Sequence, residues 1–91
     1  MAMTREDAVV RARADLAARL GVSENEVAEE SVADADFPDM ALGAAGDDEM
    51  SGQMITPGWR IRLRAGGDVH EYRANRNQIR LYNFKGANYR L

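Results

Sequence analysis

The residues best suited to chemistry are arginines, which follow an alternating pattern in the second half of the chain. Arg60, Arg62 and Arg64 alternate with other residues in TPGWRIRLRAGGDVHEYRA, residues 56–74. Arginines beside exposed aromatic rings can hold phosphates and stack bases, as in proteins that bind single-stranded nucleic acid. The competing interpretation is a solvated sheet face whose charges pair across strands. We define the predicted basic face as Arg60, Arg62, Arg64, Arg73, Arg80 and Tyr82.

The distribution of charge favours the second interpretation. Residues 1–50 carry 13 acids and four arginines, whereas residues 51–91 carry two acids and eight bases, and the whole chain has a net charge of −3. Nucleic-acid affinity depends on a net basic footprint, and nearby acids compete for it. We therefore expect the two halves to attract each other within one fold, and we keep nucleic-acid binding as the alternative.

The residues needed for catalysis or metal binding are scarce. The chain has one histidine, His70, and no cysteine, so thiolate sites and paired-histidine motifs are excluded. The segment GAAG at 43–46 lacks the lysine of a phosphate-binding loop. The acids between residues 34 and 49 could offer oxygens to calcium, but their spacing is not that of an EF-hand, and a solvated acidic loop is preferred. We predict no enzyme activity, no catalytic residue, no metal and no cofactor.

One helix is expected near the N-terminus. Thr4 and Asp7 can form a capping box, and apolar residues at 9, 12, 16 and 20 recur at helical spacing until Gly21, which can adopt the left-handed conformation that ends a helix. This predicts a helix over 5–20. Ser23 and Glu26 repeat the capping pattern before an extended segment at 27–33, although Val27 and Val32 fall on opposite faces of a regular strand.

Residues 34–58 are expected to form a long loop. Glycines, prolines and aspartates interrupt both the helical and the strand period, and about 25 residues is well beyond an ordinary connection. A disordered linker would be poorer in apolar residues, so we assign this loop a binding role. Methionines suit adaptable contact with a partner, although they also serve as core filler. The predicted partner-binding residues are Phe37, Met40, Leu42, Met50 and Met54.

The register of a hairpin can be derived from its turn. If Gly66 and Gly67 occupy the centre of a type I′ turn, Ala65 faces Asp68, and the pairs run on from Arg64 opposite Val69 to Trp59 opposite Ala74. One face is then apolar and the other basic, with Arg60 opposite Arg73. Because like charges directly opposed on a sheet are destabilising, we expect an acid from the long loop or from a partner between them.

These elements predict a single α+β domain over residues 1–91. An amphipathic helix packs on an antiparallel sheet of three to four strands, including strands at 59–65, 69–74 and 79–84. In the last strand we expect Ile79 and Leu81 to point inward and Arg80, Tyr82 and Phe84 to point outward. His70 faces Leu63 on the inner side, where a partly buried structural histidine is expected.

The ordered motifs LAARLGV, FPD, LG, TPGWRIRL and HEY resemble those of a family of small, uncharacterised bacterial domains. The resemblance covers roughly residues 8–74 and implies a helix followed by a small antiparallel sheet, but no activity. At the positions of a frequent cysteine, a tryptophan, a tyrosine and a histidine in those domains, this chain has Ala44, Phe37, Trp59 and Arg73. The arrangement is also similar to propeptide-like and cystatin-like modules, although shape does not settle function.

The function favoured by these features is a non-enzymatic interaction module that presents the 34–58 loop to another protein. A more specific version is a protease inhibitor whose loop lies in the cleft of its target. The N-terminus lacks a basic segment followed by an apolar run, and no stretch approaches the roughly 18 apolar residues of a membrane helix. We expect a cytoplasmic domain that makes no membrane contact, or an exported one if a signal peptide has been removed.

Overall fold

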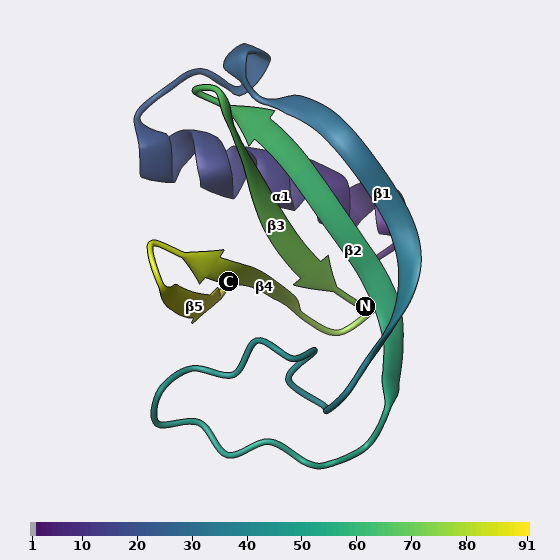
Figure 1. Ribbon diagram of the computed structural model, residues 1–91. Helices are drawn as coiled ribbons and strands as arrows, with labels where there is room; N and C mark the ends of the chain where they lie inside the picture. Colours follow the sequence, from purple (N-terminus) through teal and green to yellow (C-terminus); the bar gives the residue numbers. More distant parts are fainter. Residues whose placement is uncertain (1) are drawn as a thin grey trace.

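In a computed structural model that describes residues 2–91, one helix packs against an antiparallel sheet (Figure 1). The helix α1 spans Arg5–Leu20, and a short 3₁₀ turn, η1, spans Glu24–Glu26. Within this part of the chain the sheet has five strands in the order β1-β2-β3-β4-β5, so the α+β class is confirmed, while the expected three to four strands were too few. The strands are β1 (Ala28–Phe37), β2 (Thr56–Ala65), β3 (Asp68–Ala74), β4 (Ile79–Phe84) and β5 (Ala87–Arg90).

The helix has the ends that the sequence predicts. Thr4 and Asp7 form a capping box, and Gly21 adopts the left-handed conformation with φ of 69°. The side of α1 that faces the sheet is buried at Ala8, Ala12, Leu16 and Ala17. Small residues dominate this side, which lets the helix approach the sheet closely.

The β2–β3 hairpin adopts the predicted register at every pair from Trp59 opposite Ala74 to Ala65 opposite Asp68. Both turn glycines have positive φ, 62° at Gly66 and 83° at Gly67. The inner face of the sheet packs against α1 and forms the main core, which includes Ile61, Leu63, Tyr72, Ile79 and Leu81.

Tyr72 also joins the two layers through a polar contact. Its side chain is fully buried, and its hydroxyl donates a 2.7 Å hydrogen bond to the Asp15 carboxylate of α1. Burial, and then this carboxylate, raise the pKa of the Tyr72 hydroxyl well above its ordinary value, so the group remains a proton donor. The contact fixes the position of α1 across the sheet.

The first strand extends beyond the expected 27–33 segment, to Phe37, and it contains a bulge. The register of β1 against β2 shifts between Glu29 and Ser31, which inserts one extra residue into β1. The bulge brings Val27 and Val32 to the same side, where Val27 is part of the main core and Val32 packs against it. The loop consequently covers residues 38–55 rather than 34–58, because 34–37 belong to β1 and 56–58 to β2.

The other end of the sheet also differs from the prediction. Asn83 and Lys85 have positive φ, and the β4–β5 register shifts between Leu81 and Phe84, so the chain turns sharply and returns as β5. Phe84 therefore lies on the inner side, with its ring centroid 5.8 Å from that of His70, and the outward orientation predicted for it is wrong.

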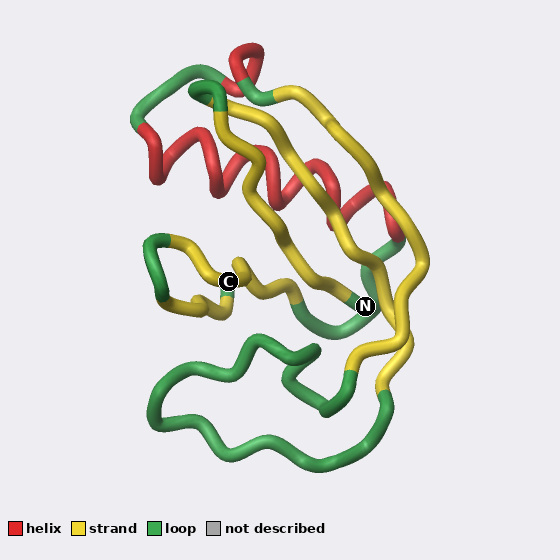
Figure 2. Tube along the Cα trace, in the orientation of Figure 1, coloured by secondary structure: helices red, strands yellow, loops and turns green. Residues whose placement is uncertain are grey.

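The 38–55 loop extends beyond one end of the sheet as a long connection between β1 and β2 (Figure 2). It buries a second, smaller group of apolar side chains, which lie outside the main core: Phe37, Ala41, Leu42 and Ala44.

Candidate functional site

The 38–55 loop is attached to the sheet by a buried arginine. Arg80, on β4, has a side chain that is 3% exposed and forms a bidentate ion pair with Glu49 of the loop, with one contact at 2.6 Å. The same guanidinium donates to Gln78 Oε1 at 2.7 Å and to the carbonyl of Ala44 at 3.4 Å. The hydrogen bonds from Arg80 lower the pKa of Glu49 from 4.5 to about 2. Arg80 is thus an internal anchor of the loop rather than a free surface cation.

Arg73 forms a second anchor. Its guanidinium lies 3.6 Å from the ring centroid of Tyr82 and 5.3 Å from that of Phe37. One nitrogen donates to the carbonyls of Leu42 and Gly43 in the loop, at 3.2 Å each. Gly43 has φ of 67°, and a Cβ there would lie 2.7 Å from that nitrogen, so the close approach depends on glycine.

Glu71 forms ion pairs with both of the opposed arginines, Arg60 and Arg73. Its carboxylate contacts Arg73 at 2.8 Å, Arg62 at 3.1 Å and Arg60 at 3.4 Å. Burial raises the pKa of Glu71, but the hydrogen bonds from Arg73 and Arg62 outweigh it and hold the pKa below its ordinary value. The acid between Arg60 and Arg73 therefore comes from β3 itself, and the expectation of an acid from the loop or a partner was wrong.

The predicted basic face is consequently a set of paired charges. Arg64 contacts Glu30 of β1 at 2.6 Å, so each of its five arginines lies within 4 Å of a carboxylate. Tyr82 lies half-buried under Arg73 rather than open to solvent. The structure brings all six predicted residues together on one side of the sheet. Arg73 and Arg80 support the 38–55 loop, whereas Arg60, Arg62 and Arg64 pair with acids of β3 and β1.

The five predicted partner-binding residues divide into two groups. Phe37 and Leu42 are buried, at 1% and 0% exposure, and they fill the space beneath the loop. Met40, Met50 and Met54 are 51%, 97% and 62% exposed, and the neighbouring Ile55, which the prediction omitted, is 71% exposed. We call these four residues the exposed loop cluster: Met40, Met50, Met54 and Ile55.

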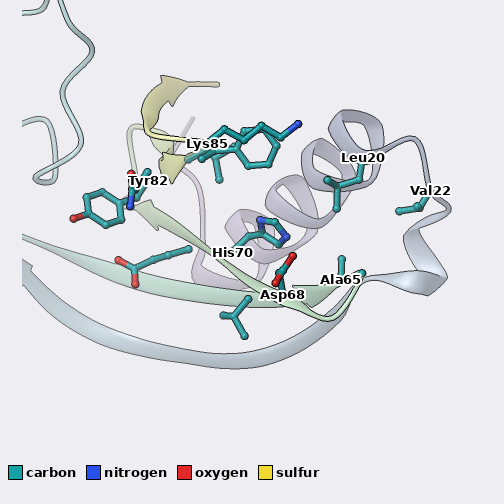
Figure 3. Close-up of a pocket in the computed structure, with 13 residues that line it drawn as sticks. Leu20, Val22, Ala65, Asp68, His70, Tyr82 and Lys85 are labelled. Carbon is teal, nitrogen blue, oxygen red and sulfur yellow. The ribbon is translucent and has the colours of Figure 1, made fainter.

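The lone histidine lies in an open pocket of about 720 Å³ (Figure 3). His70 and Asp68 project from β3 into the space between the end of α1, marked by Leu20, and the β4–β5 turn, which carries Lys85. His70 is half-buried, as expected, and its ring packs at 44° to that of Phe84. Within residues 2–91, His, Cys, Asp and Glu side chains form no group of three or more that could hold a metal ion.

A further sequence signal becomes clear once the fold is known. Between Leu20 and Trp59 the chain contains ten acids and no lysine or arginine. This acidic segment forms η1, the edge strand β1 and the 38–55 loop. The pattern of basic residues indicates only the basic face, whose arginines pair within the domain. The acidic segment between Leu20 and Trp59 is a separate signal.

The family described as "Domain of unknown function (DUF8738)" matches residues 9–82. The chain belongs to this family. The match spans α1 to β4, including the 38–55 loop and its anchors on β3 and β4. Comparisons with curated proteins and with solved structures find no match. No helix in the described part of this domain is long and apolar enough to cross a membrane.

Proposed function

We propose that this domain is a non-enzymatic interaction module that binds a partner protein through the 38–55 loop. The observation that carries the proposal is the exposed loop cluster, because four large apolar side chains protrude from one loop in which Ala41, Leu42 and Ala44 are buried. Exposed apolar patches often mark interaction sites. Three of the four residues are methionines, whose flexible side chains adapt to a partner surface.

The anchors of the loop support this proposal. Arg80 holds Glu49, and Arg73 holds the carbonyls of Leu42 and Gly43, so both halves of the loop are attached to the sheet. The backbone amide of Met40 also donates to the carbonyl of Gly52, across the loop, at 2.9 Å. A loop that is ordered before binding loses less conformational entropy when it binds.

The charges of the loop indicate the chemistry of the partner. Asp47 and Asp48 are exposed, lie beside Met50, and form no ion pair among the described residues. A complementary surface would have an apolar recess bordered by lysines or arginines. A protease whose cleft accepts the loop is one form of such a partner, and a bacterial source, as the ordered motifs imply, is part of the same proposal.

Nucleic-acid binding is the weaker hypothesis. The basic face would have to release Glu71, Glu30 and Glu49 before its arginines could reach phosphates, and Arg80 is buried. Breaking these internal pairs would offset part of the affinity gained from phosphate contacts.

Point variants test the proposal better than a deletion does. Removing residues 44–53 would also remove Glu49 and leave Arg80 without its carboxylate, so loss of binding could reflect loss of structure. Met50→Ser with Met54→Ser keeps both anchors. The matched control is Val10→Ser, which removes a 63% exposed apolar side chain from α1.

The expected result is capture of a defined protein from native extract by the wild type and by Val10→Ser, but not by the double methionine variant. Capture of the same set of proteins by all three would contradict the proposal. Circular dichroism of each variant checks that the fold is retained.

A further inference from the structure

The strand β1 forms an open edge of the sheet next to the 38–55 loop. It pairs with β2 on one side, and within residues 2–91 no strand pairs with its other side. The carbonyl of Val32 accepts a hydrogen bond from the Arg5 side chain of α1, so this carbonyl points away from β2. Alternate residues of an antiparallel strand direct their backbone groups to the same side. The backbone groups of Asp34 and Asp36 therefore point to the open edge.

An apolar pocket lies next to this part of the edge. The pocket has a volume of about 710 Å³, and Pro57 and Trp59 of β2 lie opposite Asp36 and Asp34 of β1, which also line it. Trp59 is half-buried and packs partly against the main core. Tryptophan is the best aromatic partner of a cation, and Asp34 and Asp36 line the same pocket as Trp59.

The charges of this edge select its occupant. β1 carries four acids and no base. Glu30 is paired with Arg64, and Asp34 has a 3.6 Å contact with Arg5 while its own side chain remains 85% exposed. Asp36 forms no ion pair within the described chain, and Arg76 is the one base among the residues that line the pocket. A second copy of β1 would oppose acids with acids, which disfavours self-association through this edge.

We propose that the Asp34–Asp36 edge of β1 binds an extended, basic segment of a partner protein by strand addition. Backbone hydrogen bonds to Asp34 and Asp36 provide affinity, and a lysine or arginine of the added strand lies between their carboxylates and approaches the Trp59 ring. This inference rests on the proposed function in that the same partner reaches the 38–55 loop, which begins one residue after β1.

The experiment uses a capped hexapeptide of alternating lysine and valine, and a glutamate–valine peptide as its control. Trp59 is the sole tryptophan, so its fluorescence reports directly on the pocket. Peptide affinity is compared among the wild type and four variants. The edge double substitution, Asp34→Asn with Asp36→Asn, removes two charges from β1, and the loop double substitution, Asp47→Asn with Asp48→Asn, removes two charges from the loop. Asp34→Pro is compared with Asp34→Asn. Proline removes the outward N–H of an edge strand without breaking the β1–β2 ladder.

The lysine–valine peptide is expected to change Trp59 emission and to protect the Asp34 and Asp36 amides from hydrogen exchange. We expect about five-fold weaker binding after the edge double substitution, because two exposed charge pairs are lost. The loop double substitution should leave affinity within about two-fold. Asp34→Pro should bind about ten-fold more weakly than Asp34→Asn, because a main-chain hydrogen bond is also lost.

Four results would each overturn the inference. Asp34→Pro and Asp34→Asn could bind the lysine–valine peptide with equal affinity, or the loop double substitution could weaken binding as much as the edge double substitution does. The wild type could bind the glutamate–valine peptide as tightly as the lysine–valine peptide, or Trp59 emission could stay unchanged when the lysine–valine peptide is added. If Asp34→Pro fails to fold, unprotected Asp34 and Asp36 amides in the wild type with peptide overturn it as well. The Met50→Ser, Met54→Ser variant separates this inference from the proposed function, because it should lose the partner protein and still bind the peptide.

Discussion

The ion pair between Arg80 and Glu49 predicts an unequal response to the loss of its two members. The Arg80 side chain is 3% exposed and that of Glu49 is 32% exposed, so the positive charge depends on its partner more than the negative charge does. We expect Glu49→Gln to destabilise the domain more than Arg80→Met does. The reason is that removal of one partner leaves the other charge buried, whereas an apolar replacement removes the buried charge itself.

The size of each effect follows from the contacts. Glu49→Gln removes a charged hydrogen bond and the ion pair, but Gln78 and the Ala44 carbonyl still accept from Arg80, and water can reach it from the side of Glu49. We estimate a loss of about 2 kcal/mol, below the range for a fully buried pair. Arg80→Met leaves Glu49 free to hydrate and should cost about 1 kcal/mol.

Urea unfolding followed by Trp59 fluorescence measures the two differences in free energy of unfolding, with circular dichroism as a second probe. Thermal unfolding is a separate check. For a domain of this size, its midpoint should fall by about 8–16 °C in Glu49→Gln and by about half of that in Arg80→Met. The double variant should be no less stable than Arg80→Met alone, since no buried charge would then be left without a partner. A greater loss in Arg80→Met than in Glu49→Gln, or a double variant whose loss equals the sum of both, would refute the reasoning.

Three further outcomes are expected. The pKa of Glu49 lies below its unfolded value, so its contribution to stability is full above about pH 4.5 and is lost as the pH falls towards about 2; Glu49→Gln should flatten acid unfolding in this window. Gly58→Ala should destabilise by about 3 kcal/mol in urea unfolding, because the new Cβ would overlap the Ala74 carbonyl oxygen; a neutral substitution would contradict this. A single-stranded nucleic-acid column at low salt should not retain the domain, and retention abolished by Arg62→Glu would revive the alternative function.

The parts of the fold that could be predicted from the sequence are those with local signals. The capping box at Thr4 and Asp7 and the left-handed Gly21 mark the ends of α1, and Gly66–Gly67 sets the register of the β2–β3 hairpin. In both cases, residues adjacent in sequence determine the geometry. Neither prediction requires knowing which segments far apart in the chain come into contact.

The parts that could not be predicted depend on irregular or distant contacts. The bulge between Glu29 and Ser31 interrupts the alternation of β1, so Val27 and Val32 were expected on opposite faces although both lie at the main core. The positive φ of Asn83 moves Phe84 to the inner face and begins the turn to β5, although asparagine adopts this conformation more readily than most residues. In each case one residue changes the face of the sheet to which the following side chains point.

For the candidate site, the sequence predicts which side chains share a face of the sheet but not which segment covers that face. The arginines of the basic face do share one side of the sheet, yet the partner of Arg80 lies 31 residues away, in a loop with no period. Alternation predicts which face a side chain occupies, but it does not predict which distant segment will cover that face. The burial of Phe37 and Leu42 was missed for the same reason.

The acids between Leu20 and Trp59 fall into two groups once their contacts are compared. Some serve the fold: Glu26 caps η1, Asp39 accepts from the loop amides of Ala41 and Gly43, and Glu49 holds Arg80. Asp36, Asp47 and Asp48 make no ion pair within residues 2–91 and lie exposed along β1 and the loop. Unpaired like charges repel each other and do not stabilise the folded state. A basic partner would relieve this repulsion, and the exposed methionines of the 38–55 loop would then contact its apolar residues.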